Sequence, residues 1–151
     1  MYVILVGGGK VGYYLTKTLL AEGFEVTLIE KNRSIFEKLF QEFKGSVVLG
    51  DGTDIKVLHD AGAGRADLVA SVTGYDQDNL VACQLAKRKF GVGRTIARVN
   101  NPKNEEILRR LGVDTTLSST RVIFSLIEQE VAHGGYVSSL TKDIFSNPEG
   151  K

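Results

Sequence analysis

The chain has 151 residues, of which 42% are hydrophobic and 25% are charged, as expected for one globular domain with one core. Its net charge of +1 gives no bulk electrostatic basis for binding nucleic acid or an anionic membrane surface. No run approaches the ~20 apolar residues of a membrane-spanning helix, and the single cysteine, Cys83, excludes an internal disulfide. These properties predict a cytoplasmic protein without direct membrane insertion, in which Cys83 is a small buried residue.

The N-terminal segment combines an apolar run with a glycine-rich turn. Residues 2–6 are all apolar or aromatic, which is typical of a strand buried on both faces. Gly7, Gly9 and Gly12 follow in a GxGxxG pattern, and an amphipathic stretch at 10–22 predicts a helix. A strand, a glycine turn and a helix in this order predict a phosphate-binding turn.

Each of these glycines has a separate physical role. Gly7 can adopt the tight turn that a side chain would obstruct. Gly9 lets the backbone approach a pyrophosphate, and Gly12 lets the helix pack close to the strand. The free N–H groups and partial positive charge at the helix N-terminus favour a bound phosphate.

The next predicted strand, at 25–30, ends in the acid that this type of site needs. Glu30 can accept hydrogen bonds from both ribose hydroxyls and would repel a 2′-phosphate. The nearby Lys31 weakens that repulsion slightly. Lys10, between the second and third glycines, either reaches a phosphate of its own or a neighbouring site or is a solvated lysine.

Strand and helix patterns alternate along the rest of the chain. We expect strands at 2–6, 25–30, 46–49, 67–72, 95–99 and 114–117, and helices at 10–22, 32–43, 54–60, 76–90, 102–111 and 118–133. The order predicts an α/β protein with a Rossmann-like, doubly wound, six-stranded parallel sheet and a ligand crevice between the first and fourth strands. The domain is expected to span 1–133, with 134–151 as a loosely ordered tail.

Two further strand ends are predicted to border the crevice. After the third strand, Asp51 either accepts a hydrogen bond from an adenine amino group or closes a turn or caps the next helix. After the fourth strand, Thr73 and Gly74 can line the opposite side with a hydroxyl and exposed backbone. Asp76 in the same loop is expected to cap the following helix rather than act as an acid.

The fifth strand contributes a cation, but no catalytic set accompanies it. Arg98 either meets a phosphate in the crevice or forms a structural ion pair with an acid such as Asp76. His59 and His133 do not fall at strand ends and are expected at the surface or in packing contacts. The sequence has no metal-ligand cluster, nucleophile elbow or Walker motif.

The last predicted helix has an unusually wide apolar stripe, which covers about half its circumference at ~100° per residue. The stripe consists of Val122, Ile123, Phe124, Leu126, Ile127 and Val131. The helix either lies deep in its own domain or packs partly on a second subunit. We favour the second subunit, because no later element is predicted to cover this helix.

Several dispersed segments together resemble the N-terminal nucleotide-binding domain of the Trk/Ktr potassium-uptake regulators, the TrkA-N (KTN) members of the RCK group. The segments are Gly7–Gly12, Val26–Asn32, Gly50–Thr53, Val72–Asn79, Ala97–Pro102 and Leu111–Asp114. The resemblance spans about residues 1–140. Their order and spacing are far more specific than the glycine pattern alone.

The resemblance implies a regulatory subunit rather than an enzyme, with NAD(H) or ATP/ADP as ligand. It implies a homodimer or higher ring formed through helix 118–133, at the cytoplasmic face of a potassium-translocating membrane subunit. Carried over, the phosphate-binding segment is Gly7, Gly8, Gly9, Lys10, Val11 and Gly12, with Glu30 at the ribose and Lys31 as a further cofactor-binding residue beside it. Asp51 and Gly52 would border the adenosine, Thr73 and Gly74 the far side, and Arg98 a phosphate.

One alternative stays open at this stage. The glycine turn and Glu30 are also typical of a small NAD-dependent oxidoreductase. The chain leaves only a short segment after the nucleotide-binding domain, where a typical dehydrogenase has a substrate domain.

Overall fold

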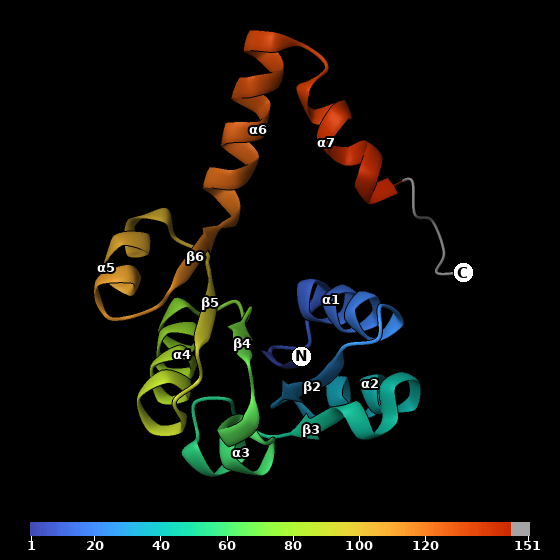
Figure 1. The fold of residues 1–151 in the computed structure, drawn as a ribbon, viewed down its shortest axis with the longest axis vertical. Helices are drawn as coiled ribbons and strands as arrows, with labels where there is room; N and C mark the ends of the chain where they lie inside the picture. The colour runs from blue at the N-terminus through green and yellow to red at the C-terminus, as the bar shows by residue number, and fades with distance from the viewer. Residues whose placement is uncertain (146–151) are drawn as a thin grey trace.

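Six parallel strands form one sheet with the strand order β3-β2-β1-β4-β5-β6 (Figure 1). The computed structural model describes residues 1–145. The strands are β1 (Tyr2–Val6), β2 (Glu25–Glu30), β3 (Val47–Leu49), β4 (Leu68–Ser71), β5 (Arg94–Val99) and β6 (Thr115–Ser118). This is the predicted doubly wound α/β fold, and the strand order reverses between β1 and β4.

The helices connect these strands in chain order and cover both faces of the sheet (Figure 1). They are α1 (Lys10–Ala21), α2 (Arg33–Phe43), α3 (Ile55–Asp60), α4 (Asp76–Phe90), α5 (Glu105–Arg110), α6 (Ser119–His133) and α7 (Tyr136–Phe145). Three short 3₁₀ turns lie at Lys44–Ser46, Ala63–Arg65 and Pro102–Asn104. The predicted helix at 102–111 is therefore split into a 3₁₀ turn and α5.

The core consists of two apolar layers, one on each face of the sheet. Alternate residues of β1 supply them: Val3 and Leu5 pack with side chains of α1 and α2, whereas Ile4 packs with α3 and α4. All five residues of β1 are buried, as a central parallel strand requires. Cys83 of α4 is also buried, which confirms its predicted place in the core.

The strand register places the crevice. Val6, the last residue of β1, lies level with Ile29 of β2 and with Ser71 of β4. The carboxyl ends of three neighbouring strands therefore meet at one edge of the sheet. In open parallel sheets, ligands bind outside these ends where the strand order reverses.

The C-terminal helices extend beyond the sheet. Ser118 ends β6 and also caps α6, because its hydroxyl accepts a hydrogen bond from the Arg121 N–H at 3.2 Å. In Figure 1, α6 leads away from the sheet, and α7 runs from the far end of α6 back toward the rest of the domain. The segment expected to be a loosely ordered tail contains α7 at Tyr136–Phe145, and its last six residues, 146–151, lie outside the described residues. Within 1–145, no helix is both long and apolar enough to cross a membrane.

Candidate functional site

A cavity of about 380 Å³ opens at the carboxyl ends of β1, β2 and β4. The glycine turn forms its floor, and the loops after β2, β3 and β4 form its walls. Of the predicted site residues, the cavity brings together Gly7, Gly8, Gly9, Glu30, Lys31, Asp51, Gly52, Thr73, Gly74 and Arg98. Lys10, Val11 and Gly12 follow in the first turn of α1 and do not line this cavity; Lys10 is exposed there.

The glycine turn has the geometry that the sequence predicts. Gly7 has a φ of +106°, which residues with side chains rarely adopt. A Cβ atom on Gly12 would lie 1.8 Å from the Gly7 carbonyl oxygen, so only glycine allows this contact between α1 and the turn. By contrast, a Cβ atom on Gly9 would meet nothing within 4 Å. The protein's own packing does not require glycine at position 9, whereas close approach of a ligand would.

Glu30 lies at the end of β2 and is largely buried. Its Oε1 accepts a hydrogen bond from the Gly8 N–H at 3.0 Å, and its Oε2 accepts one from the Asn32 N–H at 2.7 Å. The carboxylate thus fixes the β2 end to the glycine turn. Each carboxylate oxygen can accept a second hydrogen bond, so a ribose diol can still bind here.

Asp51 forms the turn that was one of its two predicted roles. Its Oδ1 accepts hydrogen bonds from the Thr53 N–H at 2.9 Å and the Thr53 hydroxyl at 2.7 Å. These two bonds, with a smaller contribution from the charge of Lys31, lower the pKa of Asp51. Asp54 caps α3 instead, since its carboxylate accepts from the Lys56 N–H. Asp51 keeps one oxygen for an adenine amino group, so the second role stays a prediction.

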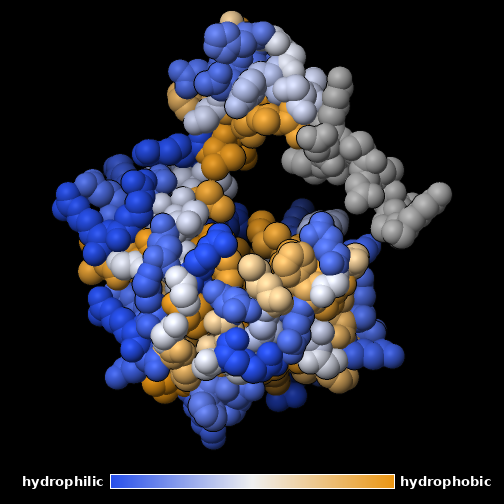
Figure 2. Space-filling model, in the orientation of Figure 1, coloured by the Kyte–Doolittle hydropathy of each residue, from blue (hydrophilic) through white to orange (hydrophobic). Residues whose placement is uncertain are grey.

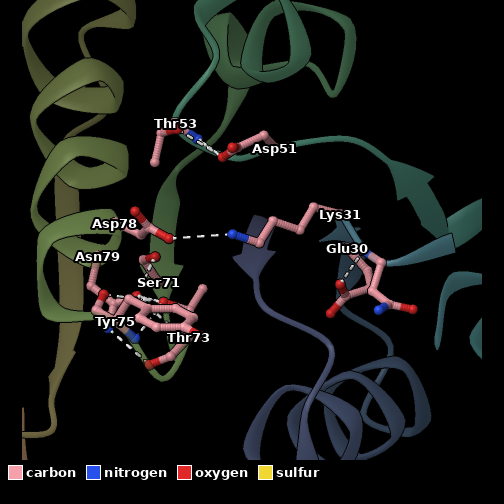
Figure 3. A network of polar contacts seen from close by, with 10 residues as sticks. Glu30, Lys31, Asp51, Thr53, Ser71, Thr73, Tyr75, Asp78 and Asn79 are labelled. Atoms are coloured by element: carbon pink, nitrogen blue, oxygen red, sulfur yellow. Dashed lines mark hydrogen bonds and ion pairs between the residues drawn. The ribbon is translucent and has the colours of Figure 1, made fainter. Parts of the chain in front are cut away.

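Lys31 reaches across the cavity from the β2 end (Figure 3). Its Nζ lies 3.6 Å from Oδ2 of Asp78 and 5.5 Å from the centre of the Tyr75 ring. Lys31 and these two side chains belong to opposite walls of the same cavity. Their contacts are partly exposed to solvent and are therefore weak.

The wall formed by Thr73 is held by Asn79, a residue with no predicted role. Asn79 is fully buried, and its Oδ1 accepts from the Ser71 hydroxyl at 2.9 Å and the Thr73 N–H at 3.0 Å. Its Nδ2 donates to the carbonyls of Thr73 and Arg98 at 3.1 and 2.8 Å. Figure 3 shows Asn79 beside Thr73, at the end of β4. The helical spacing of Asn79 with Ala82, Cys83 and Ala86, which are all buried, was the signal that places it inside.

Asp76 does not cap α4, which corrects the prediction for this residue. Tyr75 is the residue before the helix, and the Asp76 carboxylate accepts from the N–H groups of Asn100 and Asn101 and the side-chain amides of Asn100 and Asn104. Burial opposes its ionisation, but these hydrogen bonds together lower the pKa of Asp76. The residue fastens the β5 end to α4 and forms no ion pair with Arg98.

The fold, the glycine turn and the buried acid at the β2 end define a Rossmann-type domain of the nucleotide-binding class. The chain belongs to the TrkA-N domain family, which matches residues 3–119. A Trk system potassium uptake protein TrkA homolog of Methanothermobacter thermautotrophicus is 38% identical over 129 residues, covering 85% of this chain and 59% of the relative. The Mycobacterium tuberculosis TrkA protein is 36% identical over 138 residues, covering 91% and 62%. The chain thus spans about three fifths of these relatives.

Solved structures share the fold at lower identity. The TrkA-N domain of the inner membrane protein ybaL from Escherichia coli has a TM-score of 0.78 at 21% identity, with 85% of this chain and 94% of that one covered. A GsuK channel bound to NAD has a TM-score of 0.71 at 23% identity, covering 80% and 22%. The Kef C-terminal domain of Shewanella denitrificans in AMP-bound form has a TM-score of 0.72 at 24% identity, covering 97% and 90%.

Proposed function

We propose that the chain is the nucleotide-sensing regulatory domain of a potassium-uptake system. An adenine nucleotide, NAD(H) or ATP/ADP, binds in the crevice and alters the geometry between subunits, and the assembly passes this change to a membrane subunit that translocates potassium. The domain would then act at the cytoplasmic face of the membrane through that partner. Such a switch needs a ligand that binds two states of the assembly with different affinity.

The observation that carries the proposal is the glycine turn beside Glu30. Gly9 offers open space at the N-terminus of α1, where a pyrophosphate would meet unpaired N–H groups. The buried carboxylate of Glu30 lies next to this space, where it can accept hydrogen bonds from a ribose diol. Membership of the TrkA-N family and the names of its relatives support the link to potassium uptake.

The apolar arc of α6 supports a dimer. Val122, Ile123, Phe124, Ile127 and Val131 are all exposed on this helix. A groove of about 680 Å³ with an almost entirely apolar lining runs between α1 and the base of α6, over β4 and β5 (Figure 2 shows apolar side chains on both sides of it). No residue separates β6 from α6, so α6 does not turn back over its own sheet. We propose that α6 of a second copy covers the groove in a symmetric pair.

The oxidoreductase alternative required an acid or base in the crevice. Asp76, an acid in the loop after β4, does not line the cavity, and hydrogen bonds from three asparagines occupy its carboxylate. This arrangement favours the regulatory function. Substrate-dependent turnover of NADH by the purified protein would favour the enzyme instead.

A Gly9→Val variant tests nucleotide binding without disturbing the fold. The added side chain occupies the open space and meets no protein atom within 4 Å of its Cβ, so the variant is expected to fold. Calorimetric titration with NADH, NAD, ADP and ATP should give binding to the natural chain and none to the variant. At 100 times its dissociation constant, the ligand should also add about 2.7 kcal/mol to the stability of the natural chain.

The matched control is Gly93→Val. Gly93 directly precedes β5, at the amino end of that strand and away from the crevice, and the added Cβ there also meets open space. This variant should bind nucleotide like the natural chain. Potassium uptake should lose its nucleotide control in cells that carry Gly9→Val and keep it in cells that carry Gly93→Val. Retained control without nucleotide binding would contradict the proposed mechanism.

Two substitutions in α6 test the proposed dimer interface. Ile127→Glu puts a charge into the apolar arc, whereas Ala132→Glu puts the same charge on the opposite side of α6. Sedimentation should show a dimer for the natural chain and for Ala132→Glu, and a monomer for Ile127→Glu. Equal association of all three proteins would refute this interface.

A further inference from the structure

Arg98 lines both the nucleotide crevice and the apolar groove, as does Val72, and it is the charged residue of the two. Its position near the end of β5 borders the nucleotide crevice on one side and the apolar groove on the other. It lies on the same face of the sheet as Ile96, two residues earlier, which also lines the groove. Among the residues of 1–145 that line the groove, Arg98 and Ser119 are the only polar ones.

The guanidinium of Arg98 is incompletely satisfied by the protein. Its Nε is buried and has no hydrogen-bond acceptor within residues 1–145. Buried donors in native proteins are normally paired, so an unpaired one needs an explanation. A guanidinium in this position can donate to an anionic oxygen in the crevice, while its aliphatic stem contributes to the apolar wall of the groove.

The backbone around Arg98 connects the crevice to α6. Its carbonyl accepts a hydrogen bond from Asn79, which also holds Thr73 at the crevice wall. In the register of β5 and β6, Arg98 lies opposite Leu117, and the next residue, Ser118, caps α6. One strand pair therefore separates the crevice wall from the first turn of α6.

We propose that Arg98 couples nucleotide binding to the α6 interface. The guanidinium turns toward an anionic oxygen of the bound nucleotide, and its stem moves with it, which reshapes the groove that α6 of the second copy occupies. Arg98 is thus a positioning residue for the interface as well as a ligand contact. This inference rests on the proposed function, because it needs both nucleotide binding and the α6 dimer.

The test measures linkage between the two sites. The dimer dissociation constant is determined by sedimentation with and without saturating NADH or ATP, for the natural chain and for Arg98→Met. Methionine keeps an unbranched apolar stem but removes the guanidinium. Arg110→Met is the control, because Arg110 is exposed on α5, pairs with Glu106 and lines neither cavity.

For the natural chain and Arg110→Met, nucleotide should change the dimer dissociation constant by at least about fivefold, at the lower end of typical allosteric coupling. For Arg98→Met, the dimer should still form, but nucleotide should no longer change its dissociation constant. Nucleotide affinity of Arg98→Met should fall about tenfold or more, as for loss of a charged hydrogen bond, and remain measurable.

Three outcomes would overturn the inference. If Arg98→Met keeps the full nucleotide effect on dimerisation, Arg98 does not couple the sites, while the proposed function stands. If Arg98→Met binds no nucleotide at all, the residue is a main source of affinity rather than a coupling residue. If the natural chain binds no nucleotide, or nucleotide does not alter its dimer, the proposed switch itself fails and the inference fails with it.

Discussion

Replacement of Asn79 by aspartate tests how the crevice wall is held. Asn79 uses its oxygen as an acceptor for Ser71 and Thr73 and its amide as a donor to two carbonyls. Aspartate keeps the shape and the acceptor side. However, it turns a carboxylate oxygen toward the carbonyls of Thr73 and Arg98, and the site has no access to solvent.

The expected loss of stability follows from the number of unpaired groups. Each buried polar group left without its partner costs about 1–3 kcal/mol, so two carbonyls give about 2–6 kcal/mol. That is a large part of the 5–15 kcal/mol that stabilises a typical domain. Burial and the facing carbonyls should raise the pKa of the new carboxyl in the folded state, because both disfavour its ionised form.

The sign of the pH effect follows from this shift. A carboxyl whose pKa is raised on folding binds more protons in the folded than in the unfolded state, so its destabilisation increases with pH above the unfolded value of about 3.9. Protonation at lower pH restores one donor toward a carbonyl. The difference in unfolding free energy between variant and natural chain should therefore be smaller at pH 5 than at pH 8, with a slope of at most about 1.4 kcal/mol per pH unit.

Urea unfolding of both proteins between pH 5 and pH 8 measures this difference. Gln77→Glu is the control, since Gln77 is exposed in the first turn of the same helix and undergoes the same change of amide to acid. Its effect should stay within about 0.5 kcal/mol at every pH. A loss of stability in Asn79→Asp that is below about 1 kcal/mol, or that does not vary with pH, would refute the reasoning.

Three further predictions follow from the packing and the charges. Gly12→Ala should lower the thermal midpoint sharply or prevent folding, because its Cβ would lie 1.8 Å from the Gly7 carbonyl oxygen; an unchanged midpoint would contradict this. Burial raises the pKa of the Cys83 thiol to about 12, so a thiol reagent at pH 8 should modify Cys83 only after denaturant is added, as a kinetic assay can show. The lowered pKa of Asp76 contributes stability above the ordinary carboxyl value of about 3.9 that is lost as pH falls below it, so Asp76→Asn should flatten the acid side of the stability curve measured by urea unfolding.

The fold was predictable because each strand is a short apolar run that ends in turn residues. All six strands, their parallel order and the crevice at β1 and β4 agree with the prediction. The glycine turn was equally predictable, since the positive φ of Gly7 and the close contact of Gly12 are properties of the backbone itself. The local sequence pattern is sufficient to predict a residue's role where a local steric requirement selects that residue.

The polar network behind the crevice was not predictable in the same way. Asp76 has the sequence signature of a helix cap, but its partners lie in a loop more than twenty residues later. Asn79 joins two strand ends that only the folded sheet brings together. Such side chains are selected by contacts distant in sequence, so a local pattern can place them on a buried face but does not name their partners.

The direction of α6 shows a second limit of local pattern, and one boundary residue decides it. The apolar arc has the same composition whether the helix covers its own sheet or that of another copy. A turn of a few residues between β6 and α6 would be enough for the helix to fold back, and sequence patterns place boundaries only to within a few residues. In the structure, Ser118 is both the last residue of β6 and the cap of α6, so there is no turn. Within residues 1–145, the sheet face beside α1 then stays open as the groove, because α6 does not fold back over it.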